Sequence, residues 1–266
     1  MKRSILTAVV SLSTLMSALP GNVAVAQDSN SVPLIEREKL FGNPQKSGAA
    51  LSPDGNWIAW RAPLDGIMNV FVAPAGQMDS AKAVTSSKDR PIRNFFWSGD
   101  SSMILYIQDK GGDENFLLYG VNVASGEERN YTPFEKTRVR MIGGSHQIKD
   151  KILIGLNNRN PQYHDVHLLD LKTGETKEVM RNDGYAGFMA DDTLTLRMAE
   201  ESNEKGGLDY FNMVNGKVEE KPFLSTGLDD SMTTAPAGFT NDGSTLYWID
   251  ASGRNTAALY AQDVKT

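Results

Sequence analysis

A repeated pattern of short apolar runs and tight turns is the feature of this sequence that most limits its fold. Leu51 to Gly76 reads LSPDGNWIAWRAPLDGIMNVFVAPAG, in which a Ser-Pro-Asp-Gly turn precedes two apolar runs and a closing glycine. Short runs rich in β-branched and aromatic residues, bounded by turn residues, are typical of strands. Asp54-Gly55 supplies the backbone conformations that a tight turn requires. The segment therefore predicts a β-hairpin.

The same pattern returns four more times along the chain. The leading turn and first run begin again at Ser98, Ile148, Met189 and Thr240. The closing glycines Gly76, Gly126, Gly174 and Gly216 follow one another at intervals of 50, 48 and 42 residues. A period of this size with four short strands per unit is typical of a β-propeller blade. We therefore expect an all-β chain, folded as a β-propeller with four-stranded antiparallel blades.

The repeats also predict the boundaries of the blades. They place blades at about 48–87, 91–134, 138–182, 184–224 and 236–266, after a lead-in segment at 27–47 in which residues 36–40 are expected to form one helical turn. The last copy, LYAQDVKT, stops where the earlier copies have a closing glycine and an outer strand. About four and a half blades are then present, whereas propellers have about four to eight. We therefore expect an incomplete ring in a partial β-propeller, and a truncated chain.

The N-terminal residues resemble an export signal. Lys2 and Arg3 precede a mostly apolar stretch, and Ala24-Val25-Ala26 has the spacing of small residues that signal peptidases cleave. We expect residues 1–26 to be a signal peptide that is removed after Ala26, so that the chain is exported to the periplasm or outside the cell. The alternative, a membrane anchor, is disfavoured because serine and threonine interrupt the run, which is shorter than the roughly 20 apolar residues that a span needs.

Composition excludes several classes of function. The chain has 33 acidic and 27 basic residues, a net charge of −6 and no basic block, so nucleic acid is not an expected partner. It contains no cysteine, which excludes disulfides, thiol catalysis and thiolate metal ligands. No cofactor is expected.

Several phrases in order along the chain carry a family resemblance: LIEREKLFGNP, LSPDGNWIAW, APLDGIMNVFVAP, LNNRNPQYHDVHLLDLKTGE and IDASGRNTAALYAQD. They resemble the N-terminal propeller of secreted bacterial serine peptidases of the prolyl oligopeptidase family, in the branch near acylaminoacyl and dipeptidyl peptidases. The resemblance covers essentially the whole chain after the signal. It implies a C-terminal α/β-hydrolase domain with a Ser, Asp, His triad, and a propeller that caps the active site and admits short peptides.

No catalytic residue of that family can be assigned in this chain. The family's nucleophile lies in a G-x-S-x-G turn, whose glycines let the backbone expose the serine. Residues 143–147 read GGSHQ, which comes nearest and lacks the final glycine. The leading hypothesis is therefore a substrate-gating propeller whose catalytic domain is absent from this chain. The alternative is a stand-alone periplasmic propeller that binds proteins or ligands.

Three arginines are candidate substrate-channel residues. Arg138 and Arg140 alternate along the predicted inner strand of the third blade, and Arg93 lies at the entry to the second. Inner strands line the channel of a propeller, where a guanidinium can bind a peptide carboxylate through two hydrogen bonds. Pairing with acids of the chain itself is the alternative.

The remaining titratable residues predict no metal or base site. His164 and His167 have an odd spacing near a predicted strand start, which points their side chains to opposite faces, and His146 lies in another segment. We expect structural or surface roles for all three.

Acidic clusters are predicted to be turns. The loop at 108–115, QDKGGDEN, has glycine at the third position counted from Asp109, which excludes an EF-hand calcium loop. A solvated hairpin turn is expected there, with a surface facing a hydrolase domain as the alternative. The Asp-Asp pairs at 191–192 and 229–230 are adjacent, so their side chains diverge.

Overall fold

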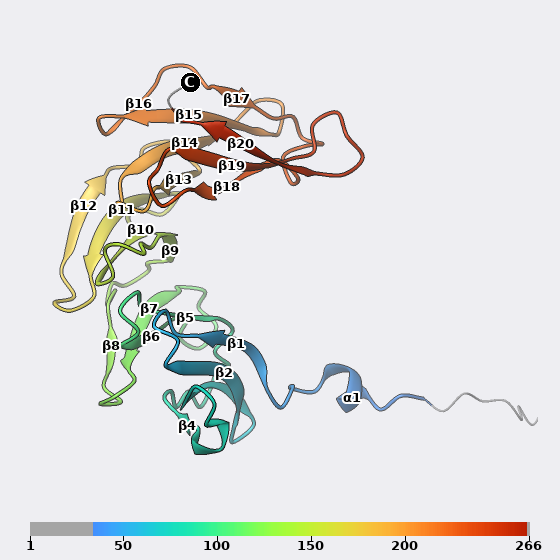
Figure 1. Cartoon of the computed structure of the whole chain (residues 1–266), viewed down its shortest axis with the longest axis vertical. Helices are drawn as coiled ribbons and strands as arrows, with labels where there is room; N and C mark the ends of the chain where they lie inside the picture. Colours follow the sequence, from blue (N-terminus) through green and yellow to red (C-terminus); the bar gives the residue numbers. More distant parts are fainter. Residues whose placement is uncertain (1–33, 265–266) are drawn as a thin grey trace, which may run out of the picture. The chain divides into compact units, whose positions relative to one another are not determined.

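Five antiparallel sheets follow one another along the chain in the computed structural model, which describes residues 34–264 (Figure 1). Within each sheet the strands pair in chain order, as the repeat predicts. Four sheets have at least four strands, and the fifth has three within the described range. The predicted fold class, an all-β chain of four-stranded antiparallel propeller blades, is confirmed.

The first three sheets contain strands β1 (Ser47–Leu51), β2 (Trp57–Leu64), β3 (Ile67–Pro74) and β4 (Lys82–Ala83); β5 (Phe95–Trp97), β6 (Met103–Gln108), β7 (Leu117–Asn122) and β8 (Glu128–Asn130); and β9 (Val139–Gly143), β10 (Lys151–Asn160), β11 (Tyr163–Asp170) and β12 (Thr176–Met180). The last two contain β13 (Gly187–Ala190), β14 (Leu196–Ser202), β15 (Leu208–Val214), β16 (Lys217–Val218) and β17 (Leu224–Ser225); and β18 (Ala235–Phe239), β19 (Thr245–Asp250) and β20 (Ala258–Asp263). A short 3-10 helix, η1 (Met78–Ser80), precedes β4.

The turn between the first two strands of a sheet is built from the repeated Ser/Thr-x-Asp pattern. The Ser52 hydroxyl donates to Asp54 Oδ1 at 2.5 Å, and Gly55 has a φ of +75°. The same hydroxyl–carboxylate bond joins Thr240 to Asp242 at 2.6 Å. These bonds, as the largest cause, lower the pKa of Asp54 and of Asp242 to about 2. The turn therefore depends on an ionised aspartate.

The core lies between neighbouring sheets, and successive residues of one strand face opposite neighbours. In β6, Ile104 packs with the first sheet while Leu105 packs with the third. In β10, Leu153 packs toward the fourth sheet and Ile154 toward the second. Because both faces of these strands are covered, the sequence shows continuous apolar runs there. Fully burying a side chain of this size contributes about 1.5 to 3 kcal/mol.

Side-chain contacts also join the sheets in pairs. Trp97 Nε1 donates to the carbonyl of Ala50 at 3.2 Å, and the Tyr131 hydroxyl donates to the carbonyl of Leu171 at 2.7 Å. The ring of Trp248 in β19 meets that of Tyr210 in β15 edge to face at 5.1 Å. Each contact connects consecutive sheets.

The outer strand of the fourth sheet differs from the prediction. The repeat predicts a single outer strand, at 217–223, to close the blade at 184–224, but β16 and β17 pair separately with the two ends of β15. Pro222 lies between them and has no N–H to donate to a ladder. The chain therefore bulges away from β15 at this point.

The described residues divide into two units, 34–42 and 43–264. In the described part of the first unit, α1 (Arg37–Phe41) forms one helical turn and ends at Gly42, whose N–H donates to Glu38 O at 2.8 Å. The predicted signal peptide at 1–26 lies outside the described residues. No helix within 34–264 has the length and apolar character to cross a membrane.

Candidate functional site

The three predicted channel arginines lie in two different sheets. Arg93 is exposed just before β5, and its carbonyl accepts a hydrogen bond from the Arg61 guanidinium. Arg138 is exposed just before β9, with its guanidinium 5.2 Å from the centre of the Phe116 ring. Arg140 is exposed within β9, the first strand of the third sheet. Arg138 and Arg140 are thus close in the chain, whereas Arg93 belongs to the second blade.

Arg140 lines a polar cavity of about 390 Å³ between the third and fourth sheets, here named the Arg140 pocket. Its lining residues come from β9, the β10–β11 hairpin, the segment before β13 and the end of β14. They are Arg140, Gln162, Tyr163, His164, Gly184, Tyr185, Ala186, Glu201 and Ser202. Arg140 Nη1 donates to the carbonyl of Ala186 at 3.3 Å across this cavity's edge.

A buried aspartate fixes the wall of the Arg140 pocket. Asp165 is 1% exposed and accepts from Arg159 Nε and Nη2, each at 2.7 Å. It also accepts from the backbone N–H of Asn182 at 2.7 Å. The hydrogen bonds from Arg159 are the largest cause that lowers the pKa of Asp165. The β10–β11 hairpin is thereby tied to the segment that leads into β13.

Asn182 shapes the segment that forms the other side of the cavity. Its Oδ1 accepts from the N–H groups of Gly184 and Tyr185, and its Nδ2 donates to the carbonyl of Tyr185. The ring of Tyr185 packs edge-on against Phe188 and Phe211. An asparagine that caps its own turn in this way gives a rigid loop without regular structure.

His164 contributes a buried imidazole to the Arg140 pocket. It is 8% exposed, and its Nε2 has no hydrogen-bond partner among the described residues. Burial, and then the positive charges of Arg140 and Arg138, lower the pKa of His164 to about 4. The imidazole is therefore neutral at pH 7. His167, by contrast, makes a 3.1 Å contact from Nδ1 to the carbonyl of Asp165.

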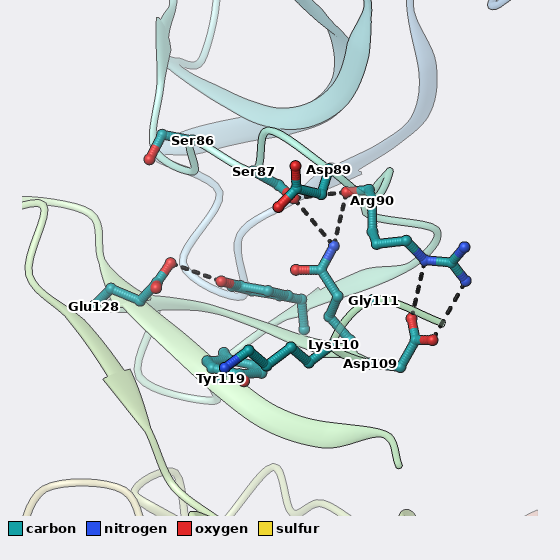
Figure 2. A pocket seen from close by; sticks show the side chains of 11 residues that line it. Ser86, Ser87, Asp89, Arg90, Asp109, Lys110, Gly111, Tyr119 and Glu128 are labelled. Atoms are coloured by element: carbon teal, nitrogen blue, oxygen red, sulfur yellow. Dashed lines mark hydrogen bonds and ion pairs between the residues drawn. The ribbon is translucent and has the colours of Figure 1, made fainter. Parts of the chain in front are cut away.

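Figure 2 shows a second cavity, of about 220 Å³, between the segment that precedes β5 and the second sheet. The guanidinium of Arg90 pairs with Asp109 at 3.3 Å, and the hydroxyl of Tyr106 donates to Glu128 at 2.6 Å. Burial, and then the bond to Glu128, raise the pKa of Tyr106. Arg90 and Asp109 neutralise each other's charge, and Glu128 is held by a neutral phenol, so the polar groups that these contacts join have partners within the protein.

The loop after β6 is only partly the solvated turn that was expected. Residues 110–114 are exposed, but Asp109 is 7% exposed and is held by Arg90. Arg90 lies 19 residues earlier in the chain, so this pairing depends on how the segment before β5 packs on the hairpin. No local pattern indicates it.

Ser145 is engaged in the turn that follows β9. Its hydroxyl donates to the carbonyl of Asp192 at 2.5 Å and accepts from the N–H groups of Gln147 and Ile148. His146 Nδ1 lies 3.1 Å from Asp192 Oδ1, but the hydroxyl hydrogen of Ser145 goes to a backbone carbonyl and not to this imidazole, so the histidine is not placed as a base for the serine. Ser, His and Asp are close in space here, but they do not form the chain of hydrogen bonds from serine to histidine to aspartate that nucleophilic catalysis requires.

No group of three or more His, Asp or Glu within residues 34–264 is placed to hold a metal ion. The pairs at 191–192 and 229–230 both lie in turns, as predicted. Asp191 accepts from Arg197 Nη1 at 2.7 Å, and Asp192 accepts from the backbone of His146. These carboxylates stabilise turns.

Sheets of this kind, packed one against the next in chain order, define a β-propeller protein. The chain is 43% identical over 233 residues to dipeptidyl aminopeptidase BIII of Pseudoxanthomonas mexicana, and 30% identical over 245 residues to dipeptidyl peptidase family member 6 of Caenorhabditis elegans. Each comparison includes 87% of this chain. The chain is thus a peptidase-family β-propeller, homologous to part of both relatives, and the resemblance read from the sequence is confirmed.

The chain spans about a third of each of these relatives, 34% and 33% of their lengths. Among solved structures, prolyl oligopeptidase B from Galerina marginata matches with a TM-score of 0.58 and 13% identity, over 83% of this chain and 32% of that one. That likeness shows the shared fold. No protein-family model matches the chain.

Proposed function

We propose that this chain is the propeller portion of a secreted serine peptidase and restricts the substrates of that enzyme to short peptides. The 43% identity with dipeptidyl aminopeptidase BIII over 87% of the chain carries this proposal. The chain spans about a third of that relative, so we assign hydrolysis to the whole protein. Its partners are then a short peptide substrate and a C-terminal α/β-hydrolase domain.

The contacts of Ser145 and the exposure of two arginines support separate roles for the propeller and the hydrolase domain. Ser145 donates its hydroxyl hydrogen and accepts two backbone hydrogen bonds within its turn, so it is not a nucleophile of the expected kind. Arg138 and Arg140 are exposed beside the first strand of a blade, and such strands line the central channel of a propeller. The chain therefore contributes access and binding, and the hydrolase domain contributes acyl transfer.

The proposal is tested with the product of the complete reading frame that contains this chain, beside the 266-residue chain alone. Both are treated with a fluorophosphonate probe and with dipeptidyl p-nitroanilides. The complete product is expected to label at one serine outside the chain and to release p-nitroaniline, whereas the chain alone does neither. A complete product without labelling or hydrolysis would refute the proposal and would favour the stand-alone binding propeller.

Export is part of the same proposal, and the order Lys2-Arg3, apolar run, Ala24-Val25-Ala26 supports it. Expressed in a Gram-negative host, the protein is expected in the periplasm or the medium with Gln27 as its first residue. N-terminal sequencing that begins at Met1 would contradict this.

A further inference from the structure

The Arg140 pocket contains polar groups that the protein itself leaves without matching partners. Two buried side-chain atoms within residues 34–264 have no hydrogen-bond partner, His164 Nε2 and Asp192 Oδ2. Asp192 is already held through its other oxygen by the backbone and ring of His146. His164 lines the cavity, and leaving such an atom unpaired costs about 1 to 3 kcal/mol.

Arg140 differs from the arginines that stabilise the fold. Arg90, Arg159 and Arg197 each pair with a buried aspartate. The Arg140 guanidinium instead donates to one neutral carbonyl, that of Ala186, and forms no ion pair within 34–264. A guanidinium in this state offers further N–H donors in a planar arrangement that matches a carboxylate.

We propose that the Arg140 pocket binds the C-terminal carboxylate end of a short peptide. Arg140 binds the carboxylate, and the buried, neutral imidazole of His164 forms part of the wall beside it. Tyr163 and Tyr185 form the partly apolar walls along which the peptide lies. This inference rests on the proposed function, because a propeller that admits short peptides is what brings such a ligand to the cavity.

Size and charge agree with this ligand class. The volume of about 390 Å³ falls in the range of small-ligand sites. Because the pKa of His164 is about 4, the imidazole is neutral at pH 7 and the nearby positive charge comes from the arginines. The one acid that lines the pocket, Glu201, is exposed and forms no ion pair with Arg140. The cavity therefore favours one negative group beside Arg140.

The test measures binding of tetraalanine and of tetraalanine amide to the complete 266-residue chain by isothermal titration calorimetry. The amide has the same shape and lacks the negative charge. Tetraalanine is expected to bind about tenfold more tightly than the amide, the usual effect of a charged hydrogen bond. Arg140→Gln is expected to remove this preference, and Arg254→Gln, an exposed arginine between β19 and β20 that does not line the pocket, is the matched control that retains it.

Equal affinity for the two peptides, or no binding of either, would overturn the inference even without any variant. A preference that survives Arg140→Gln would also overturn it. Failure here is separable from failure of the proposed function. Peptidase activity of the complete product without carboxylate preference leaves the peptidase proposal intact, while carboxylate preference in a product without peptidase activity supports the pocket alone.

Discussion

Asp165 is the residue on which the local structure beside the Arg140 pocket most depends. Asp165→Asn removes the charge that Arg159 and the Asn182 backbone share. We expect unfolding free energy to fall by about 2 to 3 kcal/mol, since the pair is buried on the aspartate side. Urea denaturation measures this. Lys172→Gln, which breaks an exposed 3.0 Å pair with Asp150, should cost less than about 1 kcal/mol. An equal loss of unfolding free energy in the two variants would contradict the structural role given to Asp165.

Gly120 marks a close approach inside the core. A Cβ at this position would lie 2.7 Å from Tyr131 Cε2 and 2.8 Å from Leu105 Cδ2. Gly120→Ala should therefore destabilise the chain by about 1 to 3 kcal/mol through overpacking. Gly144→Ala is the control, because a Cβ there meets nothing within 4 Å. Thermal melts compare the two variants, and a lower melting temperature is expected for Gly120→Ala. Equal melting temperatures would show that the core accommodates the methyl group.

Single residues were predictable where the signal is local. The Asp54-Gly55 turn follows from backbone chemistry, and the structure shows it in that form. His164 was assigned a structural or surface role, and its unpaired nitrogen was not foreseen. The pairing of β10 with β11 shifts register between Leu156 and Asn160, opposite His164, and His164 lines the cavity. The order of residues along the sequence does not indicate such a register shift.

Among the strands, β20 is largely exposed to solvent and β10 is largely buried. Five of the six residues of β20 are exposed, and its pairing within the described residues is to β19. β10 is paired on both sides and buried over five consecutive residues. Backbone amides of β20 are thus expected to exchange with solvent orders of magnitude faster than those of β10. Hydrogen exchange with mass spectrometry resolves the two segments; similar protection would mean that β20 has a partner of its own.

Elements with both faces buried were the easiest to predict, because they leave continuous apolar runs in the sequence. The outer strands were harder. They pair on one side, are short, and carry mixed residues, as β4 and β8 do. Their ends are set by packing and by local breaks such as Pro222, which splits the expected strand at 217–223.

At the scale of the whole molecule, the aspartates of the turns make the free energy of unfolding decrease at low pH. The pKa values of Asp54, Asp170 and Asp242 are lowered to about 2 in the folded protein from an ordinary value of 3.8. The unfolded chain then binds more protons between about pH 4 and 2, so stability is complete above this window and is lost as the pH falls through it. Urea midpoints measured from pH 6 to 2.5 should decline below about pH 4. A flat profile would contradict this.

The role that we propose for this propeller is to admit short peptides to a peptidase site. The decisive measurement is kcat/KM of the complete reading-frame product on a series of peptides that share one cleavable dipeptide and differ only in length, from four to thirty residues. The account predicts efficient cleavage of the shortest members and a steep fall with length, with no cleavage of folded casein-sized proteins. A kcat/KM that stays constant along the series would show that the propeller does not restrict access.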